Sequence, residues 1–322
     1  MGDTEKNMEE SLLQKGRKDK RTETPSITWG VLTEEIKRLG FLAAPMVAVT
    51  LSLYLLQVIS MMMVGHLGEL ALSSTAIAIS LSVVTGFSLL FGMASALETL
   101  SGQAYGAQQY RKLGVQTYTA IFSLTLVCFP VSLIWIYIGK FLTLIGQDPL
   151  ISHEAGKFTI WLVPALFAYA TLQPLVRYFQ AQSLVKPMLI SSLATLSFHI
   201  PLCWALVFKS GLGNVGAALA INISYWLNVI LLGLYMKYSS ACAKTRVPIS
   251  MELFQGIGEF LQFAIPSAIM ICLEWWSFEL LILVSGLLPN PQLETSVLSV
   301  CLTTISTLYM IPYGLGAAAR CC

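Results

Sequence analysis

The sequence predicts an all-α protein that crosses a membrane about eight times. Hydrophobic residues make up 56% of the 322 residues, charged residues only 11%, and the mean hydropathy is +0.72. Soluble domains carry about 25% charged residues. Eight apolar stretches are each long enough to span the hydrocarbon of a bilayer as a helix, namely 41–64, 71–97, 114–138, 158–181, 188–208, 212–236, 259–288 and 295–319.

This composition excludes several classes of protein. An ordinary soluble enzyme or a disordered chain would carry many more charged residues. A net charge of +2 offers no basic surface for phosphates, so we expect no nucleic acid partner. We expect the lipid bilayer to be the main surroundings of the chain, and we expect no enzymatic activity.

The charges of the tail and of the loops predict the orientation of the spans. Residues 1–40 hold 8 Lys or Arg and 8 Asp or Glu. If the N-terminus is cytosolic, that side receives 16 of the Lys and Arg residues: the 8 in the tail and Arg111, Lys112, Arg177, Lys186, Lys237, Lys244, Arg246 and Arg320. The opposite side receives only Lys140, Lys157 and Lys209. Positive charge accumulates on the cytosolic side of membrane proteins, so we expect a cytosolic N-terminus.

The last two spans repeat the pattern of the first two. Pro45 and Pro266 are 221 residues apart, and so are Gly65 and Gly286. The similar segments 91–96 and 313–318 are 222 residues apart. Six spans separate the starts of the copies, so both copies run in the same direction. We expect four parts: a cytosolic polar tail at 1–35, a first six-helix bundle at 36–236, a cytosolic linker at 237–258 and two helices of a second bundle at 259–322.

No motif for a cofactor, a metal or ATP is present in the chain. The Gly-Lys pairs at 139–140 and 156–157 are each followed by Phe, so neither belongs to a phosphate-binding loop. The seven cysteines form no CxxC pair and have no histidine at metal-ligand spacing. Energy for any pumping would therefore come from an ion gradient or from a partner.

The most informative single residue is Glu274, near the middle of the span 259–288. A carboxylate at bilayer depth costs about 3 kcal/mol on insertion scales. Burial disfavours its charged form, so such a group can bind and release a proton as its surroundings change. We predict that Glu274 couples protons to transport; the alternative is a protonated Glu that only holds a helix interface.

Other candidates each have two interpretations. Glu98 ends the second span, either as an interfacial anchor or as a functional acid. Gln57 and Asn222 lie inside spans, where polar side chains either join helices or line a substrate cleft. Trp275 and Tyr309 could face an organic cation or pack in the membrane interface. Hinge candidates, which could instead be packing kinks, are Pro45, Pro266 and Pro312.

Four long motifs carry a family resemblance: VGHLGELA at 64–71, ALETLSGQAYGA at 96–107, CLEWWSFE at 272–279 and SGLLPNPQLETSVL at 285–298. Over about residues 30 to 319 the chain resembles the plant branch of the multidrug and toxic compound extrusion (MATE) transporters, also called detoxification proteins. The resemblance implies two six-helix bundles around a central cleft. It also implies proton-coupled antiport, by alternating access, that exports small organic compounds such as xenobiotics or secondary metabolites.

The resemblance also bears on single residues. The family's acid in the seventh helix corresponds to Glu274. Glu98 and Gln103 fall in a family motif, and we count both among the candidates for the substrate cleft. Bacterial relatives often carry an acid in the first helix, where this chain has Gln57. The resemblance does not distinguish the plasma membrane from the vacuolar membrane.

The family continues where this chain ends, so we expect a shortened product with one complete bundle and the first two helices of a second. An alternative is a truncated, non-transporting isoform that binds or regulates the full-length transporter, which would make another copy of the transporter a partner. A seven-helix receptor is a third class, and the eight spans and the charge distribution argue against it.

Overall fold

The computed structural model describes residues 29–248, 250–285 and 287–319, and these residues contain helices and no strand. The helices in chain order are α2 (Trp29–Gly65), α3 (Glu69–Ser82), η1 (Val83–Phe87), α4 (Ser88–Gly106), α5 (Tyr110–Ile136), α6 (Ile138–Leu144), α7 (Pro149–Ala181), α8 (Val185–Trp204), η2 (Ala205–Lys209), α9 (Asn214–Tyr238), η3 (Ser240–Cys242), α10 (Glu252–Gln255), α11 (Ile257–Ser285) and α12 (Pro291–Ala319). The chain divides into two units, residues 1–41 and 42–322. Residues 29–41, the described part of the first unit, form the beginning of α2.

The prediction of eight membrane spans is confirmed. Among the described residues, eight helices are long and apolar enough to cross a membrane: Ala43–Gly65, Glu69–Gly106, Tyr110–Ile136, Pro149–Ala181, Val185–Lys209, Asn214–Tyr238, Ile257–Ile282 and Pro291–Ala319. Several run past the predicted apolar limits because helical hydrogen bonding continues into polar residues. The fourth span begins at Pro149 rather than at 158. The Asp148 side chain caps its start by accepting hydrogen bonds from the backbone N–H groups of Leu150 and Ile151.

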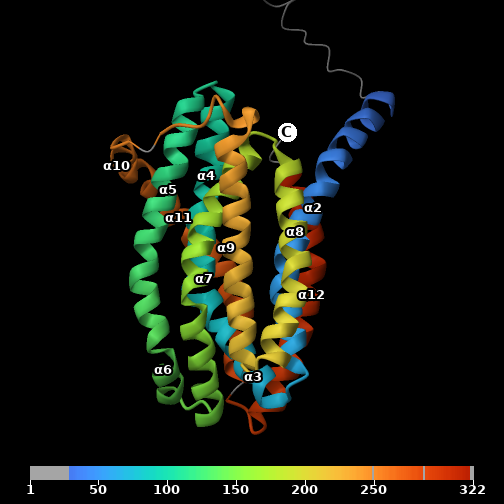
Figure 1. Ribbon diagram of the computed structural model, residues 1–322, viewed down its shortest axis with the longest axis vertical. Helices are drawn as coiled ribbons and strands as arrows, with labels where there is room; N and C mark the ends of the chain where they lie inside the picture. The colour runs from blue at the N-terminus through green and yellow to red at the C-terminus, as the bar shows by residue number, and fades with distance from the viewer. Residues whose placement is uncertain (1–28, 249, 286, 320–322) are drawn as a thin grey trace, which may run out of the picture. The chain divides into compact units, whose positions relative to one another are not determined.

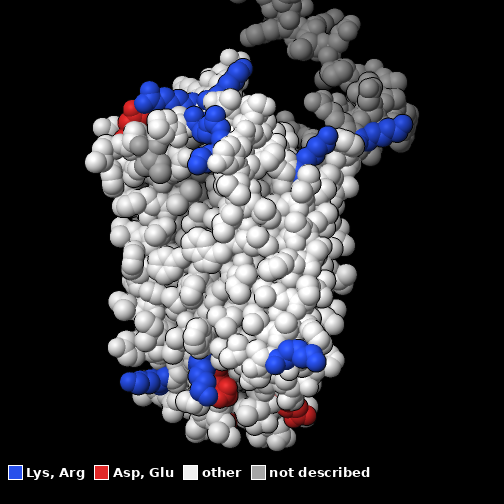
Figure 2. All heavy atoms as spheres, in the orientation of Figure 1, with Lys and Arg blue, Asp and Glu red and all other residues white. Residues whose placement is uncertain are grey.

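Charged side chains lie mainly at the two ends of the helices. Figure 2 shows a broad band without Lys, Arg, Asp or Glu on the face in view, with charged side chains above and below it. We call the end at which α4, α7 and α9 finish the basic end (Figure 1). The cations near it are Arg111, Lys112, Lys186, Lys237, Lys244 and Arg246. Residues 239–248 and 250–256, within the expected linker, also lie at this end and include η3 and α10 (Figure 1).

Within residues 42–319, the two C-terminal helices pack on the earlier spans at two close crossings. A Cβ atom added to Gly92 of α4 would lie 2.5 Å from Cα of Ala268 on α11. One added to Gly314 of α12 would lie 2.6 Å from Cα of Val47 on α2. Only glycine allows backbones to approach this closely, as is common between membrane helices.

These two crossings are equivalent under the repeat. Ala268 corresponds to Val47 under the offset that relates Pro266 to Pro45, and Gly314 corresponds to Gly92 in the similar segments 313–318 and 91–96. The second span of each copy therefore crosses the first span of the other copy through the same glycine. This exchange of equivalent contacts is the pattern of two copies related by a pseudo-twofold axis.

Candidate functional site

Aromatic side chains from both copies of the repeat meet between the two crossings. The ring of Phe91 on α4 stacks on that of Trp275 on α11, with centroids 5.2 Å apart and an interplanar angle of 24°. The Phe91 ring also lies 6.1 Å from the ring of Tyr313 on α12. Helix α4 of the first copy and helices α11 and α12 of the second thus bring three aromatic rings together.

A second set of aromatic contacts lies within the first six spans, beginning at Phe87, one turn before Phe91. Tyr169 on α7 packs edge-on against Phe87, with centroids 5.0 Å apart, and lies 5.9 Å from Tyr225 on α9. Gln57 on α2 donates a hydrogen bond to the Tyr225 hydroxyl at 3.1 Å. We call Phe87, Phe91, Tyr169, Tyr225, Trp275 and Tyr313 the aromatic cluster.

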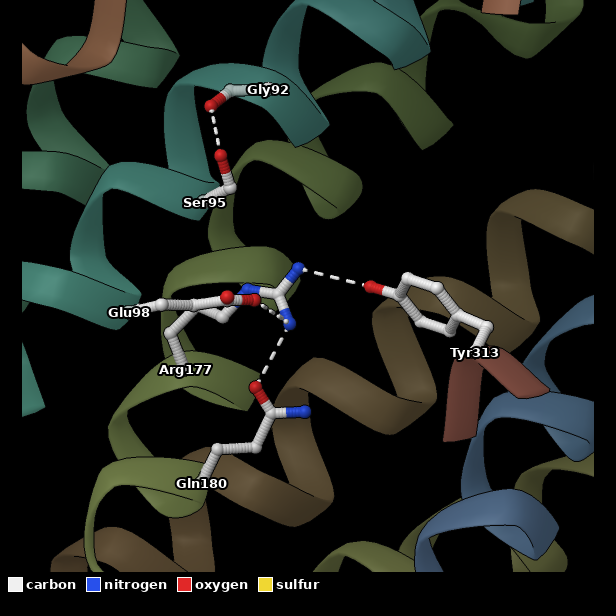
Figure 3. Close-up of polar contacts among 6 residues, drawn as sticks. All are labelled: Gly92, Ser95, Glu98, Arg177, Gln180 and Tyr313. Carbon is white, nitrogen blue, oxygen red and sulfur yellow. Dashed lines mark hydrogen bonds and ion pairs between the residues drawn. The ribbon is translucent and has the colours of Figure 1, made fainter. Parts of the chain in front are cut away.

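A buried ion pair adjoins the aromatic cluster. The Arg177 side chain on α7 is 2% exposed, and its Nη1 lies 3.0 Å from Oε1 of Glu98 on α4. Nη1 also donates to Gln180 at 2.8 Å, and Nη2 donates to the Tyr313 hydroxyl at 3.4 Å. The guanidinium carbon lies 5.1 Å from the centre of the Phe91 ring. Figure 3 shows Glu98, Arg177 and Tyr313 converging from three helices.

The sequence of α4 explains how this helix contributes to both features. Phe91, Ser95 and Glu98 are spaced four and three residues apart, so they lie along one face of the helix. Phe91 meets the aromatic cluster and Glu98 meets Arg177. Ser95 lies between them and donates its hydroxyl to the carbonyl of Gly92 at 2.7 Å (Figure 3).

Arg177 corrects the sequence analysis, which counted it among the loop cations. Helix α7 continues to Ala181, so Arg177 lies inside the helix, one turn before its end. An arginine buried in the bundle needs an acidic or aromatic partner, and Glu98 and Phe91 supply both. The signal that could have found it is an Arg inside the apolar run 158–181.

Three of the predicted cleft residues come together around the aromatic cluster. Trp275 belongs to the cluster, Gln57 bonds to Tyr225, and Glu98 pairs with Arg177. The other three lie elsewhere. Gln103 is exposed and lines a hollow of about 180 Å³ at the basic end, Asn222 is buried and donates to the backbone carbonyl of Trp161, and the Tyr309 side chain is 50% exposed on α12.

Glu274 directly precedes Trp275 on α11, and its side chain is exposed in the described part of the chain. Its backbone carbonyl accepts a hydrogen bond from the Ser277 hydroxyl at 2.8 Å.

The predicted hinge prolines lie inside helices that continue on both sides of them. Pro45 is in α2, Pro266 in α11 and Pro312 in α12. Each proline lacks an N–H, so each leaves one carbonyl on the preceding turn without its helical partner. The chain thus has a weakened turn in three of the four helices that form the close crossings.

The second span contains a feature that sequence reasoning missed. Residues Val83–Phe87 form a π-helical turn between α3 and α4. Trp135 on α5 donates its indole N–H to the Thr85 hydroxyl at 2.8 Å in this turn. π-helical turns inside α-helices often occur at functional sites, and this one presents Phe87 to the aromatic cluster.

Among the described residues, no group of three or more His, Cys, Asp or Glu side chains lies close enough to hold a metal ion. The site offers aromatic faces and an ion pair between a buried arginine and a partly exposed glutamate. Aromatic faces of this kind can stack on a planar or cationic organic group.

Eight apolar helices, two crossings related by a repeat and a polar and aromatic site between them define a multi-pass α-helical membrane protein. The profile of the MatE family matches residues 45–205, half of the chain. The chain belongs to this family, whose members are transporters rather than enzymes.

Curated relatives agree with this assignment. Protein DETOXIFICATION 14 of Arabidopsis thaliana is 68% identical over 285 residues, which cover 88% of this chain and 59% of the relative. Protein DETOXIFICATION 12 of the same plant is 60% identical, covering 99% of this chain and 66% of the relative. The chain thus spans about three fifths to two thirds of the length of these relatives.

Solved structures show the same fold. A crystal structure described as the eukaryotic MATE transporter AtDTX14 superposes with a TM-score of 0.83 at 67% identity, covering 89% of this chain and 64% of that one. A crystal structure of a MATE in the straight conformation has a TM-score of 0.70 at 15% identity and covers 87% of this chain. At that identity the second likeness concerns the fold alone.

Proposed function

We propose that the protein is a secondary active transporter that exports small organic compounds in exchange for protons by alternating access. The observation that carries the proposal is the meeting of Phe91, Trp275 and Tyr313, which come from both copies of the repeat. A binding site shared by two copies changes shape when one copy moves against the other, which is the basis of alternating access.

The chemistry of the aromatic cluster favours an organic substrate with a flat or cationic group. Aromatic faces attract cations and stack on planar molecules. Tyr169, Tyr225 and Tyr313 add hydroxyl groups, and Gln57 adds an amide, so the same region can also accept or donate a few hydrogen bonds. Xenobiotics and secondary metabolites commonly combine an aromatic body with a few polar atoms.

Glu274 is the group that we assign to proton coupling. Its position within a span makes the charged form costly. Helix α11 carries both Glu274 and Trp275, so a movement of this helix can couple protonation to substrate binding. Bending of α11 near Pro266 would move both residues together, because they lie eight and nine positions after that proline on the same helix. No ATP-binding loop occurs in the sequence, which is consistent with an ion gradient as the source of energy.

The charge distribution supports a direction for the export. Positive charge marks the cytosolic side of a membrane protein, so we assign the basic end and the N-terminus to the cytosol. The substrate would then enter from the basic end and leave at the opposite end. The membrane in question is the plasma membrane or the vacuolar membrane, both of which carry proton gradients.

The experiment measures efflux of a fluorescent organic cation driven by a pH gradient from cells that express the chain. We expect Glu274→Gln to lower the gradient-driven rate at least tenfold, because the amide cannot exchange a proton. The matched control is Glu294→Gln, at an exposed position in the first turn of α12, which should leave the rate unchanged. Efflux by Glu274→Gln at the parent rate and with the parent pH dependence would contradict the proposal.

A further inference from the structure

Arg177 links the two copies of the repeat at the basic end. Its helix, α7, belongs to the first six spans, as does Glu98 on α4, whereas Tyr313 lies on α12. Arg177, Tyr313 and Glu98 lie four, six and eight residues before the C-terminal residues of their helices, which are at the basic end. Along α4, Glu98 lies between Phe91 and the helix end, so this contact joins the first six spans to α12 on the side of the aromatic cluster that faces the basic end.

The geometry of arginine suits a bridge of this kind. A guanidinium group is planar and offers donors in several directions. One edge of Arg177 meets Glu98 and Gln180, while Nη2 reaches the Tyr313 hydroxyl. The acid and the amide fix the side chain within the first six spans, so its bond to Tyr313 is the one that breaks when α12 moves away.

One hydrogen-bond donor of Arg177 has no acceptor in the described part of this structure. Within the described residues, Nε of Arg177 is buried without a hydrogen-bond partner. A buried unpaired donor opposes the closed arrangement. If α12 moves away, water can reach Nε, and this gain offsets the lost bond to Tyr313. Two arrangements of similar free energy are what a switching element requires.

We propose that Arg177 and Tyr313 form a gate at the basic end, closed in this structure, and that the gate opens when Tyr313 leaves Arg177 while Glu98 stays with it. The inference rests on the proposed transport cycle and adds to it the element that controls access from one side. Arg177 acts here as a positioning residue, since it holds Tyr313 and not the substrate.

The test uses Ser95 as a reporter of access. Ser95 lies one helical turn deeper than Glu98 on the same face of α4, so a reagent from the basic end must pass the gate to reach it. Ser95→Cys is introduced into the full chain after the native cysteines are replaced by Ser or Ala. The labelling rate with a charged, membrane-impermeant methanethiosulfonate is measured from the basic side, without substrate or pH gradient.

Tyr313→Phe keeps the ring against Phe91 and removes the hydroxyl that accepts from Arg177. We expect it to raise the labelling rate about tenfold, the effect of losing one hydrogen bond to a charged group. Arg177→Lys should raise the rate as well, because a single ammonium that pairs with Glu98 cannot also hold Tyr313. Tyr309→Phe, on an exposed tyrosine one turn earlier in α12, is the matched control and should match the parent.

Labelling at the parent rate in both Tyr313→Phe and Arg177→Lys, each shown to be folded by a single symmetrical gel-filtration peak, would overturn the gate. Because labelling is read without transport, this result is independent of the efflux assay. Faster labelling in the two variants, combined with no proton-driven efflux by the parent, would support the gate and contradict only the proposed function.

Discussion

The rings of Phe91 and Tyr313 lie with their centroids 6.1 Å apart, tilted by 49°, and the two residues occupy equivalent positions of the internal repeat. Each directly precedes the glycine at which its helix crosses the other copy. Equivalent residues of two related copies can meet only near the axis that relates them. The aromatic cluster therefore lies at the centre of the arrangement, where relative movement of the copies changes the site most directly.

The buried ion pair should contribute more to stability than a surface pair. Removing one partner of a buried pair leaves an uncompensated charge and costs about 3–5 kcal/mol. We therefore expect Glu98→Ala to lower the thermal stability of the purified chain in detergent substantially. The matched control is Glu252→Ala, which breaks the exposed 2.6 Å pair with Arg111 and should cost less than about 1 kcal/mol. Equal losses in the two variants would contradict the burial of Arg177.

The close crossing of α4 and α11 should not tolerate even a methyl group. Gly92→Ala places a Cβ 2.5 Å from Cα of Ala268, so one backbone must shift, and overpacking of this kind typically costs about 1–3 kcal/mol. Gly102→Ala lies on the same helix with nothing within 4 Å of the added Cβ. We expect thermal denaturation to show a loss for Gly92→Ala and none for Gly102→Ala; indistinguishable melting curves would show that the helices do not approach this closely.

The stack of Trp275 on Phe91 should matter for substrate binding. Trp275→Ala removes one of the aromatic faces, and such contacts are worth about 0.5–2 kcal/mol. We expect the KM for efflux of an aromatic cation to rise about 3- to 30-fold. The control is Trp161→Ala on α7, where the ring is 49% exposed. A KM that is raised equally in both variants would argue against a role for the aromatic cluster in binding.

Cys242, outside the spans, should show a shifted pH dependence of alkylation. Burial raises the pKa of its thiol, while a hydrogen bond with Tyr178 and the charge of Arg246 act in the opposite direction. Only the thiolate reacts, so the alkylation rate rises with pH until the thiol is fully ionised. In the folded chain this plateau should be reached at a higher pH than in the unfolded chain. Because the folded pKa is the higher one, the thiol stabilises the fold below its ordinary pKa, and that contribution is lost as the pH rises through the folded pKa.

Maleimide labelling followed by peptide mass spectrometry measures this rate for Cys242 in the folded chain and in the chain unfolded by detergent. Superimposable pH profiles would show that the Cys242 thiol is not buried in the folded chain.

Hydrophobic runs were sufficient to predict the number and the order of the spans, because a helix in lipid must be apolar over about 20 residues. The offset that relates Pro45 to Pro266 likewise pointed to the repeat. Tertiary contacts were not accessible in this way. Arg177 was counted as a loop cation, since its partner Glu98 lies two spans earlier in the chain and hydropathy carries no information on pairing.

The candidate site was predicted in part. Trp275, Gln57 and Glu98 were identified as polar or aromatic residues in apolar surroundings, and they do lie around one site. Asn222 has the same local signature but bonds to the carbonyl of Trp161 within the first six spans. The π-helical turn at Val83–Phe87 has no sequence signature of its own, because it depends on how Trp135 and neighbouring side chains pack against it.

The most direct test of proton-driven export is a flux measurement on the purified 322-residue chain in liposomes, with a fluorescent organic cation and an imposed pH gradient. We expect the cation to move against the flow of protons. This movement should stop when an ionophore removes the gradient, and it should be absent in Glu274→Gln. A folded and reconstituted chain whose cation flux is the same with and without the gradient would contradict proton-driven export.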